Sequence, residues 1–305
     1  MTTPSPTGPT LVNDVPPLPP RSPSLHKGQA GRVCIIAGSR GLSGAAVLAA
    51  EGALRGGAGL VRVCCPVGIQ PVVAAAEPCA MTFGLPEDPN GRVRGPEAVR
   101  TLDWDWPTVV AIGPGLGRAD ALPEFVAAVL RRFGGPVVVD ADGLNNLAPL
   151  AESVLAERAD RPTILTPHPG EMARLRAARG WPPAAEDDAG RLRSAHEYAA
   201  AACVTVILKG HRTVVATGTH AYVNTTGNAG MATGGMGDVL TGLVAALVAQ
   251  GLPAFEAARL AVYVHGLAAD HAAVQLGPVG YLARDVADFV PAALAEASRP
   301  RIGFR

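Results

Sequence analysis

The segment from residue 228 to residue 238 combines residue types that bind phosphate groups. It reads Asn-Ala-Gly-Met-Ala-Thr-Gly-Gly-Met-Gly-Asp, and an apolar run of helical character follows it directly. Free backbone amides at the start of a helix, together with the helix dipole, attract phosphate oxygens. Gly234, Gly235 and Gly237 let the backbone approach a ligand without obstruction by a Cβ atom. We therefore expect a phosphate site here, with Asp238 either as a catalytic carboxylate or simply as a helix cap.

The elements that would position this segment alternate between two types along the chain. From residue 32 onward, short β-branched runs alternate with longer segments rich in Ala and Leu, which is typical of βαβ units. Most of the short runs are apolar throughout, as strands covered on both faces are. We expect strands at Val33–Ala37, Leu60–Cys65, Val109–Ile112, Val137–Asp140, Thr163–Thr166, Val204–Leu208, Thr213–Ala216 and Ala221–Asn224. We expect helices at Ala45–Arg55, Leu122–Phe133, Arg191–Ala202, Val239–Gln250, Pro253–Leu276 and Asp285–Ala297.

This alternation predicts an α/β fold of three layers, with a mostly parallel central sheet flanked by helices on both faces. In such a sheet, ligands bind outside the carboxyl ends of the strands, which is where the Gly-rich segments of this sequence fall. The length of 305 residues suits one large domain. We place that domain at residues 25–305, because residues 1–24 are rich in Pro, Ser and Thr and favour an extended, poorly packed and disordered arm.

The bulk composition argues against several classes of function. The 26 Lys and Arg residues balance the 26 Asp and Glu residues, so no overall charge attracts nucleic acid or an anionic membrane, and we expect a small substrate. The start lacks a signal-peptide pattern, and the sequence has no uninterrupted stretch of about 18 apolar residues, which favours the cytoplasm. The five cysteines have no paired C-x-x-C spacing, so we expect reduced core residues rather than metal ligands.

Two further loops carry charged and polar residues at the same expected edge of the sheet. Lys209-Gly-His-Arg-Thr213 lies between two expected strands and would bring two cations and a hydroxyl to a ligand, or would form a solvated hairpin turn. Thr166-Pro-His-Pro-Gly-Glu171 ends a strand, and its prolines fix the backbone around His168. The imidazole would then either meet a polar ligand at little ordering cost or hydrogen-bond within the protein. Glu171 would either cap the following helix or hold Mg²⁺ through water.

A glycine turn and a pair of carboxylates also follow strands. Gly113-Pro-Gly-Leu-Gly117 permits close approach of the backbone to a ligand. The sequence contains neither a Gly-x-Gly-x-x-Gly fingerprint nor a P-loop, which argues against a dehydrogenase that transfers hydride. Asp140 and Asp142 could orient loops or bind Mg²⁺ through water, and Asp142 could instead cap a helix.

Taken together, these segments resemble the ribokinase-like superfamily and, within it, the ADP-dependent (S)-NAD(P)H-hydrate dehydratase family. The stretch from Asn224 to Gly242 carries most of the resemblance. Lys27-Gly-Gln-Ala-Gly, Ala37-Gly-Ser and Ser43-Gly-Ala-Ala add to it, and the matching segments run in order as far as the C-terminal helices. One departure is Met236, which stands where the family usually has Ser or Thr. A hydroxyl contact from that position is absent here, because a thioether is only a weak acceptor.

The resemblance implies a set of site residues. Asp238 would be the catalytic residue. The substrate would be contacted by Ala45, from an early loop that could otherwise be an ordinary strand-to-helix turn, and by Gly117, His168 and Asp238. The nucleotide would be bound by Lys209, Gly210, His211, Arg212, Thr213, Asn228, Gly235 and Gly237. No side chain is assigned as a direct metal ligand.

The resemblance also implies an activity. ADP, or ATP, would drive dehydration of the S-epimer of hydrated NADH or NADPH back to NADH or NADPH, releasing phosphate and AMP, with Mg²⁺ as cofactor. Asp238 would deprotonate the ring hydroxyl while the nucleotide donates its terminal phosphoryl group. Because a helix N-terminus favours negative charge, we expect Asp238 to stay ionised and to act as a weak base, which suffices in a loose phosphoryl transfer. An NAD(P)H-hydrate epimerase would be the functional partner, and the chain would form a homo-oligomer such as a tetramer.

Two alternatives compete with this interpretation. A ribokinase-like kinase for a vitamin precursor or a sugar would use the same Asp238 and Gly-rich segment, although the Thr166–Glu171 segment and the match before residue 60 argue against it. A catalytically idle protein that binds a nucleotide or assists assembly is supported only by Met236, since the other residues of the expected site are present.

Overall fold

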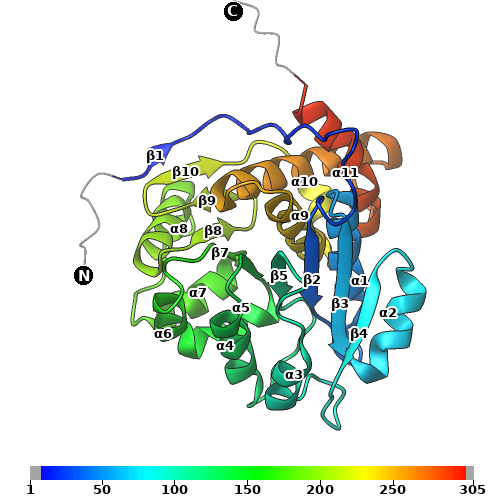
Figure 1. Cartoon of the computed structure of the whole chain (residues 1–305). Helices are drawn as coiled ribbons and strands as arrows, with labels where there is room; N and C mark the ends of the chain where they lie inside the picture. The colour runs from blue at the N-terminus through cyan, green and yellow to red at the C-terminus, as the bar shows by residue number, and fades with distance from the viewer. Residues whose placement is uncertain (1–7, 300–305) are drawn as a thin grey trace, which may run out of the picture.

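A ten-stranded sheet runs through the computed structural model, which describes residues 8–299 (Figure 1). Its strand order is β1-β10-β9-β8-β7-β6-β5-β2-β3-β4. Neighbouring strands are parallel except at β9, which is antiparallel to both β8 and β10. The strands are β1 Thr10–Leu11, β2 Arg32–Ile36, β3 Leu60–Pro66, β4 Met81–Leu85, β5 Val109–Ile112, β6 Val137–Val139, β7 Thr163–Leu165, β8 Thr205–Leu208, β9 Val214–Ala216 and β10 His220–Val223.

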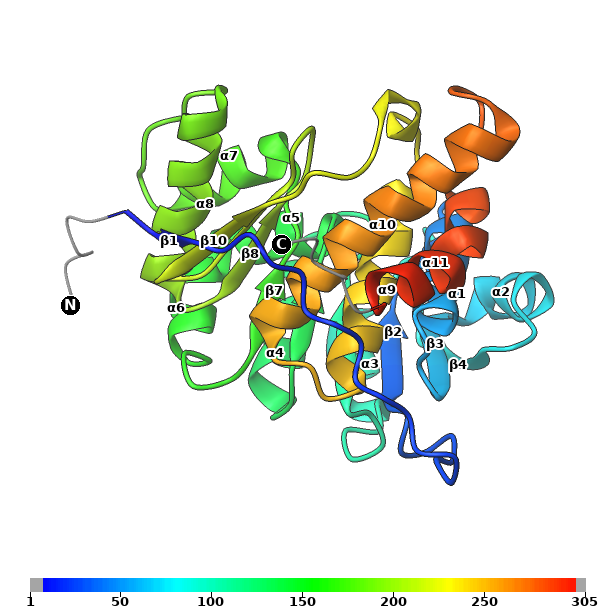
Figure 2. The same cartoon turned by 90° about the horizontal axis from the view of Figure 1, so that it is seen from above.

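Helices cover both faces of this sheet, as the alternating pattern predicts (Figures 1 and 2). One face carries α1 Ser43–Arg55, α2 Gln70–Ala76, α9 Met236–Ala249, α10 Ala254–Leu276 and α11 Ala283–Ala297. The other carries α3 Gly95–Thr101, α4 Leu122–Arg132, α5 Asp142–Leu147, α6 Ala151–Ala156, α7 Pro169–Ala178 and α8 Asp188–Ala202. Short 3-10 helices lie at η1 Val67–Ile69, η2 Ala148–Leu150 and η3 Ala229–Met231. The expected three-layer α/β fold is therefore confirmed.

The apolar strands divide their side chains between two cores. In β2, Val33 and Ile35 pack against the helices of the first face, whereas Cys34 and Ile36 pack against those of the second. Successive side chains of a strand point to opposite faces, so a strand buried on both faces has to be apolar at every position.

Several elements were not predicted from the sequence, and four helices (α1, α8, α9 and α11) begin two or three residues earlier than expected. The edge strand β4 has alternating partial exposure rather than a continuous apolar run. The short helices α2, α3, α5, α6 and α7 were likewise missed. The helix α9 begins at Met236 rather than at the expected Val239, so Asp238 lies within its first turn. Among the described helices, none is long and apolar enough to cross a membrane.

The Pro-rich arm packs more closely than expected. Residues 1–7 of the expected arm lie outside the described residues. From there the chain runs along the body, and β1 pairs in parallel with β10. Val15 and Leu18 pack against the core, and Arg259 Nη1 donates to the Asp14 carboxylate at 3.0 Å. The expectation of a poorly packed segment is therefore wrong for Thr10 to Leu18.

The cysteines correct a second expectation. All five are free, as expected of reduced residues, but only three of them are buried. Cys79 and Cys203 are exposed, because Cys79 precedes the edge strand β4 and Cys203 forms the left-handed end of α8. The expectation of five core cysteines is wrong for these two.

Candidate active site

The Gly-rich segment turns sharply into α9 at Gly235. This residue has φ +91° and forms the N-cap of the helix, and an added Cβ would lie 2.5 Å from Leu48 Cδ1. The left-handed backbone conformation therefore favours glycine, and any side chain here would also have to displace Leu48. Met236, Gly237 and Asp238 form the first helical positions, where backbone amides have no partner within the helix. This is the arrangement expected of a phosphate site.

Asp238 stands on this first turn as the third residue of α9, so it is not the N-cap of the helix, which is Gly235. Burial, and after it the charge of Asp140, raise the pKa of its carboxyl to about 7 against the opposing effect of Lys209. The expectation that Asp238 stays fully ionised as a weak base is therefore wrong. The helix N-terminus does favour the anion, but desolvation and a second carboxylate outweigh it. A carboxyl with a pKa near neutrality is suited to general acid–base chemistry.

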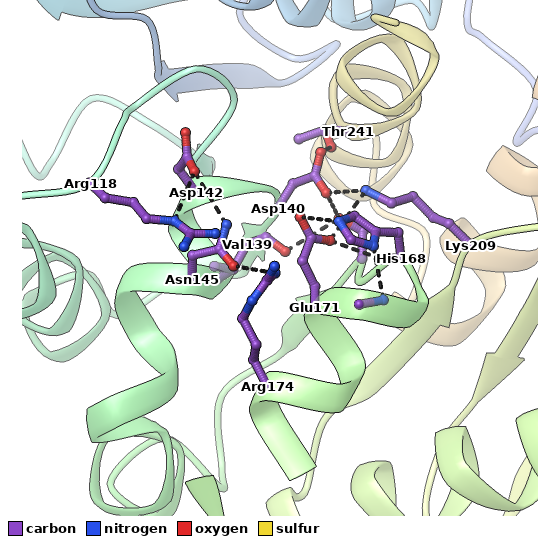
Figure 3. A network of polar contacts seen from close by, with 12 residues as sticks. Arg118, Val139, Asp140, Asp142, Asn145, His168, Glu171, Arg174, Lys209 and Thr241 are labelled. Carbon is purple, nitrogen blue, oxygen red and sulfur yellow. Dashed lines mark hydrogen bonds and ion pairs between the residues drawn. The ribbon is translucent and has the colours of Figure 1, made fainter. Parts of the chain in front are cut away.

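Asp140, at the carboxyl end of β6, is the centre of the polar network in Figure 3. Its side chain is 1% exposed. One carboxylate oxygen accepts hydrogen bonds from Thr166 Oγ1 at 2.6 Å and from Lys209 Nζ at 2.5 Å. The other accepts from Thr241 Oγ1 of α9 at 2.7 Å. Both oxygens of this buried carboxylate are thus satisfied by the protein, as a buried charge requires.

The loop that follows β7 is fixed by its own side chains. His168 is the N-cap of α7: its Nδ1 accepts from Gly170 N at 3.0 Å, and its backbone N–H donates to Glu171 Oε2 at 2.8 Å. Its Nε2 lies 3.3 Å from Glu171 Oε1, and the ring is 51% exposed. Glu171 thus completes a capping box. His168 is held rigidly at the same edge as Asp140, with half of its surface open to a ligand.

The turn from Lys209 to Thr213 joins β8 to β9 and sends its cations in different directions. Lys209 Nζ reaches inward to Asp140 and lies 3.9 Å from Glu171 Oε2. Burial lowers the pKa of Lys209, but the Asp140 and Glu171 carboxylates raise it by more, so the ammonium stays charged. Arg212, with φ +52°, instead pairs with Asp188 at 3.5 Å. The sequence alone did not distinguish these two orientations.

The far side of this turn faces a separate cavity of about 460 Å³ between α7 and α8. Gly210 and His211 line it, and Asp238 does not. Arg191 of α8 donates to the backbone carbonyls of His211 and Lys209 and so fixes the turn from behind.

Asn228 anchors the other end of the Gly-rich segment. Its Nδ2 donates to Asp270 Oδ1 at 2.9 Å and to Ala269 O at 3.2 Å. Its Oδ1 accepts from Tyr281 OH at 2.6 Å and from Gly230 N at 3.0 Å. The amide of Asn228 makes all of these hydrogen bonds with other groups of the protein. The side chain therefore shapes the loop rather than pointing a free polar group at a ligand.

The glycine turn after β5 meets the first loop of the chain. Gly117 N donates to Asp142 Oδ2 at 2.9 Å, which gives Asp142 a loop-orienting contact at the start of α5 rather than an N-cap. At Gly115, with φ +61°, an added Cβ would lie 2.9 Å from Ala45 Cβ. Ala45, in the first turn of α1, therefore lies next to the glycine turn that contains Gly117, and both residues were expected at the substrate. Gly113 packs on the Asp140 backbone, since its added Cβ would lie 1.9 Å from Asp140 O.

Comparison with known proteins agrees with this geometry. The family described as NAD(P)H-hydrate dehydratase matches residues 33–292. The chain belongs to this family. A bifunctional NAD(P)H-hydrate repair enzyme from Moorella thermoacetica is 45% identical over 90% of this chain and 51% of its own length. An ADP-dependent (S)-NAD(P)H-hydrate dehydratase from Neisseria meningitidis serogroup B is 39% identical over 88% of this chain and 86% of its own.

Solved structures support the same assignment to the NAD(P)H-hydrate dehydratase family. An ADP/ATP-dependent NAD(P)H-hydrate dehydratase from Bacillus subtilis, co-crystallised with ATP and Mg²⁺, aligns with a TM-score of 0.77 and 30% identity over 92% of this chain and 95% of its own. Ribokinase from Thermotoga maritima shares the fold alone, with a TM-score of 0.57 and 14% identity. The chain spans about half the length of the first bifunctional relatives.

Four residues of this family member escaped the sequence analysis: Thr166 as a side chain, Thr241, Asp270 and Tyr281. Thr241 had a detectable signal, since it lies three positions after Asp238 on an expected helix and so shares its face. Asp270 and Tyr281 had none, because only the tertiary structure brings them to Asn228.

Residues 8–299 contain no cluster of side chains that could bind a metal ion on their own. No three His, Cys, Asp or Glu side chains there come together in a group that could hold a metal ion. The oxygens of Asp140 accept bonds from protein donors, and those of Glu171 face His168.

Proposed function

We propose that this chain uses ADP or ATP to dehydrate the S-epimer of hydrated NADH or NADPH and so restores the reduced cofactor. The observation that carries the proposal is Asp238, a carboxyl with a pKa of about 7 on the first turn of α9, next to glycine amides that have no helical partner. Family membership and the named activities of the relatives from N. meningitidis and B. subtilis support it.

The two reactants would approach Asp238 from different loops. The substrate would lie against Ala45, Gly117 and His168. Ala45 lies next to Gly115 of the glycine turn that contains Gly117, and Gly113 of the same turn packs on the Asp140 backbone. The nucleotide would lie against the Gly235–Asp238 turn and the turn that runs from Lys209 through Gly210, His211 and Arg212 to Thr213. Lys209 would act from beneath Gly237, since an added Cβ there would lie 3.2 Å from its Nζ. Asn228 would hold the nucleotide loop in shape.

The chemistry requires a better leaving group than hydroxide. Asp238 would take the proton of the ring hydroxyl while the oxygen of that hydroxyl attacks the terminal phosphorus of the nucleotide. The bond from that phosphorus to the nucleotide oxygen breaks, which releases AMP when ADP is used. Phosphate then departs as the lone pair of the ring nitrogen forms a double bond, and loss of a proton from the neighbouring ring carbon restores the reduced nicotinamide. Backbone amides of the α9 turn would stabilise the transferred phosphoryl group.

Magnesium would enter with the nucleotide. Mg²⁺ keeps several waters and is commonly held by substrate phosphates and few carboxylates.

The direct test is Asp238→Asn. We expect the rate of NADH formation from its hydrate to fall by about 10²- to 10⁴-fold, the contribution typical of a general base, with a smaller loss of nucleotide binding. The matched control is Asp285→Asn, because Asp285 occupies the equivalent third position of α11, where its carboxylate caps the backbone of Leu282 at 2.7 Å. Near-parental activity of Asp238→Asn would overturn the proposal.

The same assay separates the alternatives. Hydrated NADH with ADP or ATP, compared side by side, should give inorganic phosphate and restore the absorbance of the reduced cofactor. A kinase for a vitamin precursor or a sugar would instead leave a stable phosphorylated product. An idle nucleotide-binding protein would bind ADP without turnover.

We further propose a functional partnership with an NAD(P)H-hydrate epimerase. The bifunctional name and roughly twofold length of several relatives support it. In the test, added epimerase should let the chain consume both epimers of the hydrate rather than about half of an epimeric mixture. We place this reaction in the cytoplasm and expect a homo-oligomer such as a tetramer, which light scattering would measure.

A further inference from the structure

Asp140 lies directly under the catalytic end of α9 but cannot touch a ligand there. Its side chain is 1% exposed, and its donors come from three separate parts of the fold: Thr166 after β7, Lys209 after β8 and Thr241 on α9. A carboxylate that accepts hydrogen bonds from three parts of the protein fixes the relative positions of the elements that supply these donors.

Two of these contacts place Asp140 next to the reacting groups. Thr241 follows Asp238 by about one helical turn, so both project from the same face of α9, and the bond from Thr241 ties that face to the end of β6. At Gly237, an added Cβ would lie 3.2 Å from Lys209 Nζ and 3.7 Å from Asp140 Oδ2. The backbone at the phosphate turn therefore rests on the Lys209–Asp140 ion pair.

The two charges of the pair act on Asp238 in opposite directions. Burial raises the pKa of Asp238 first, Asp140 raises it next, and Lys209 lowers it. His265 lies behind this point, and burial together with Lys209 lowers its pKa to about 4, so it adds no charge near neutral pH. The titratable groups that face the site from the surrounding elements are Asp140 and Asp142 at the end of β6, Glu171 on α7, Lys209 after β8 and His265 on α10.

We propose that Asp140 is a positioning residue for the reaction: it holds Lys209 beneath Gly237 and supplies the negative charge that keeps Asp238 basic. The importance of this role of Asp140 for catalysis rests on the proposed function. Without the Asp140 charge, the ammonium of Lys209 would remain beside Asp238 uncompensated, and Asp238 would become a weaker base. Without Lys209, Asp238 would bind its proton more tightly.

The test compares three single variants by the titration of Asp238 itself. Asp140→Asn keeps the size of the side chain and an oxygen acceptor but removes its charge. Lys209→Met removes the opposite charge. Asp142→Asn is the matched control, because it makes the same change at a partly exposed carboxylate after the same strand that contributes least to the Asp238 shift. The titration is followed by the ¹³C NMR signal of the Asp238 carboxyl in ligand-free protein labelled with ¹³C-Asp. This signal is assigned by its absence from the spectrum of Asp238→Asn.

We expect the proton affinity of Asp238 to fall about tenfold in Asp140→Asn and to rise by a similar factor in Lys209→Met, as removal of a charge a few ångströms away does. Asp142→Asn should shift it less than Asp140→Asn. The acid limb of kcat/KM for hydrated NADH should move in the same directions. A merely structural Asp140 would lower stability without moving the Asp238 titration.

An unchanged Asp238 titration in Asp140→Asn, or one that moves upward, would overturn the inference. If Asp140→Asn does not fold, Lys209→Met decides alone, and an unchanged or lowered proton affinity there overturns it. The carboxyl titration needs no turnover. If the parent protein fails to dehydrate hydrated NADH, the proposed function is wrong. The titration spectra would still decide whether Asp140 sets the charge of Asp238.

Discussion

The Gly-rich segment before α9 is held at its two ends by clusters of opposite character. The Asp140 cluster (Asp140, Thr166, Lys209 and Thr241) is built around a buried ion pair. The Asn228 cluster (Asn228, Asp270 and Tyr281) links its side chains through an uncharged amide, closer to the surface. Both fix the backbone, but only the first places charge against Asp238. The comparison shows that one cluster can set the chemistry of the site, whereas the other sets only its shape.

The largest effect should come from truncating the charged cluster. Asp140→Ala leaves the ammonium of Lys209 and the hydroxyls of Thr166 and Thr241 without their acceptor. We expect the free energy of unfolding to fall by about 3–5 kcal/mol, as it does when one partner of a buried pair is removed. Urea unfolding monitored by circular dichroism measures this change. A loss below about 1 kcal/mol, typical of surface pairs, would contradict this prediction, because the Asp140 cluster would then stabilise the fold no more than an exposed ion pair does.

The second effect is a pH-dependent gain from removing Asp238. Its folded pKa, about 7, lies above the ordinary value of about 3.9. Its favourable contribution to folding is therefore fully present below pH ~4 and is lost as the pH rises through ~7. Asp238→Asn escapes this loss, so its stability relative to the parent should rise by on the order of 2–4 kcal/mol between pH 4 and pH 8. Unfolding curves at both pH values measure it, and a pH-independent difference would contradict it.

The sequence predicted the parts of this site that depend on local pattern. The strand Val109–Ile112 has the expected bounds, and the glycines before α9 marked the sharp turn into that helix. The start of α9 was placed too late because Met-Gly-Asp looks like loop, since glycine is a poor helix former. The packing of the arm was missed because its contacts, such as Arg259 with Asp14, are made with distant parts of the chain.

The charge state of Asp238 could not be predicted from the sequence for a related reason. It depends on burial and on Asp140, which the fold brings to the face of α9 through a contact that spans 101 residues, Thr241 to Asp140. A helix start alone argues for a normal or lowered pKa. Only the tertiary structure shows that desolvation and a second carboxylate prevail over it.

A smaller effect is expected from the Asn228 cluster. Asn228→Ala removes the acceptor of Tyr281 OH and Gly230 N and the donor to Asp270. We expect a loss of about 1–3 kcal/mol, the cost of leaving such polar groups unsatisfied, together with weaker ADP binding measured by calorimetry, because the nucleotide loop loses its anchor. The Asp238 titration should stay at its parental midpoint, since no charge near it changes. A shift as large as that of Asp140→Asn would erase the distinction between the two clusters.

The smallest effect isolates one hydrogen bond of the Asn228 cluster. Tyr281→Phe removes only the hydroxyl that donates to Asn228 Oδ1 at 2.6 Å, while Gly230 N still donates to the same oxygen at 3.0 Å. We expect the free energy of unfolding to fall by about 1 kcal/mol, the net value of one hydrogen bond, measured by urea unfolding. In the double variant with Asn228→Ala, the Tyr281 change should add little, because its partner is already gone. Full additivity would show that Tyr281 acts on this loop by packing rather than through Asn228.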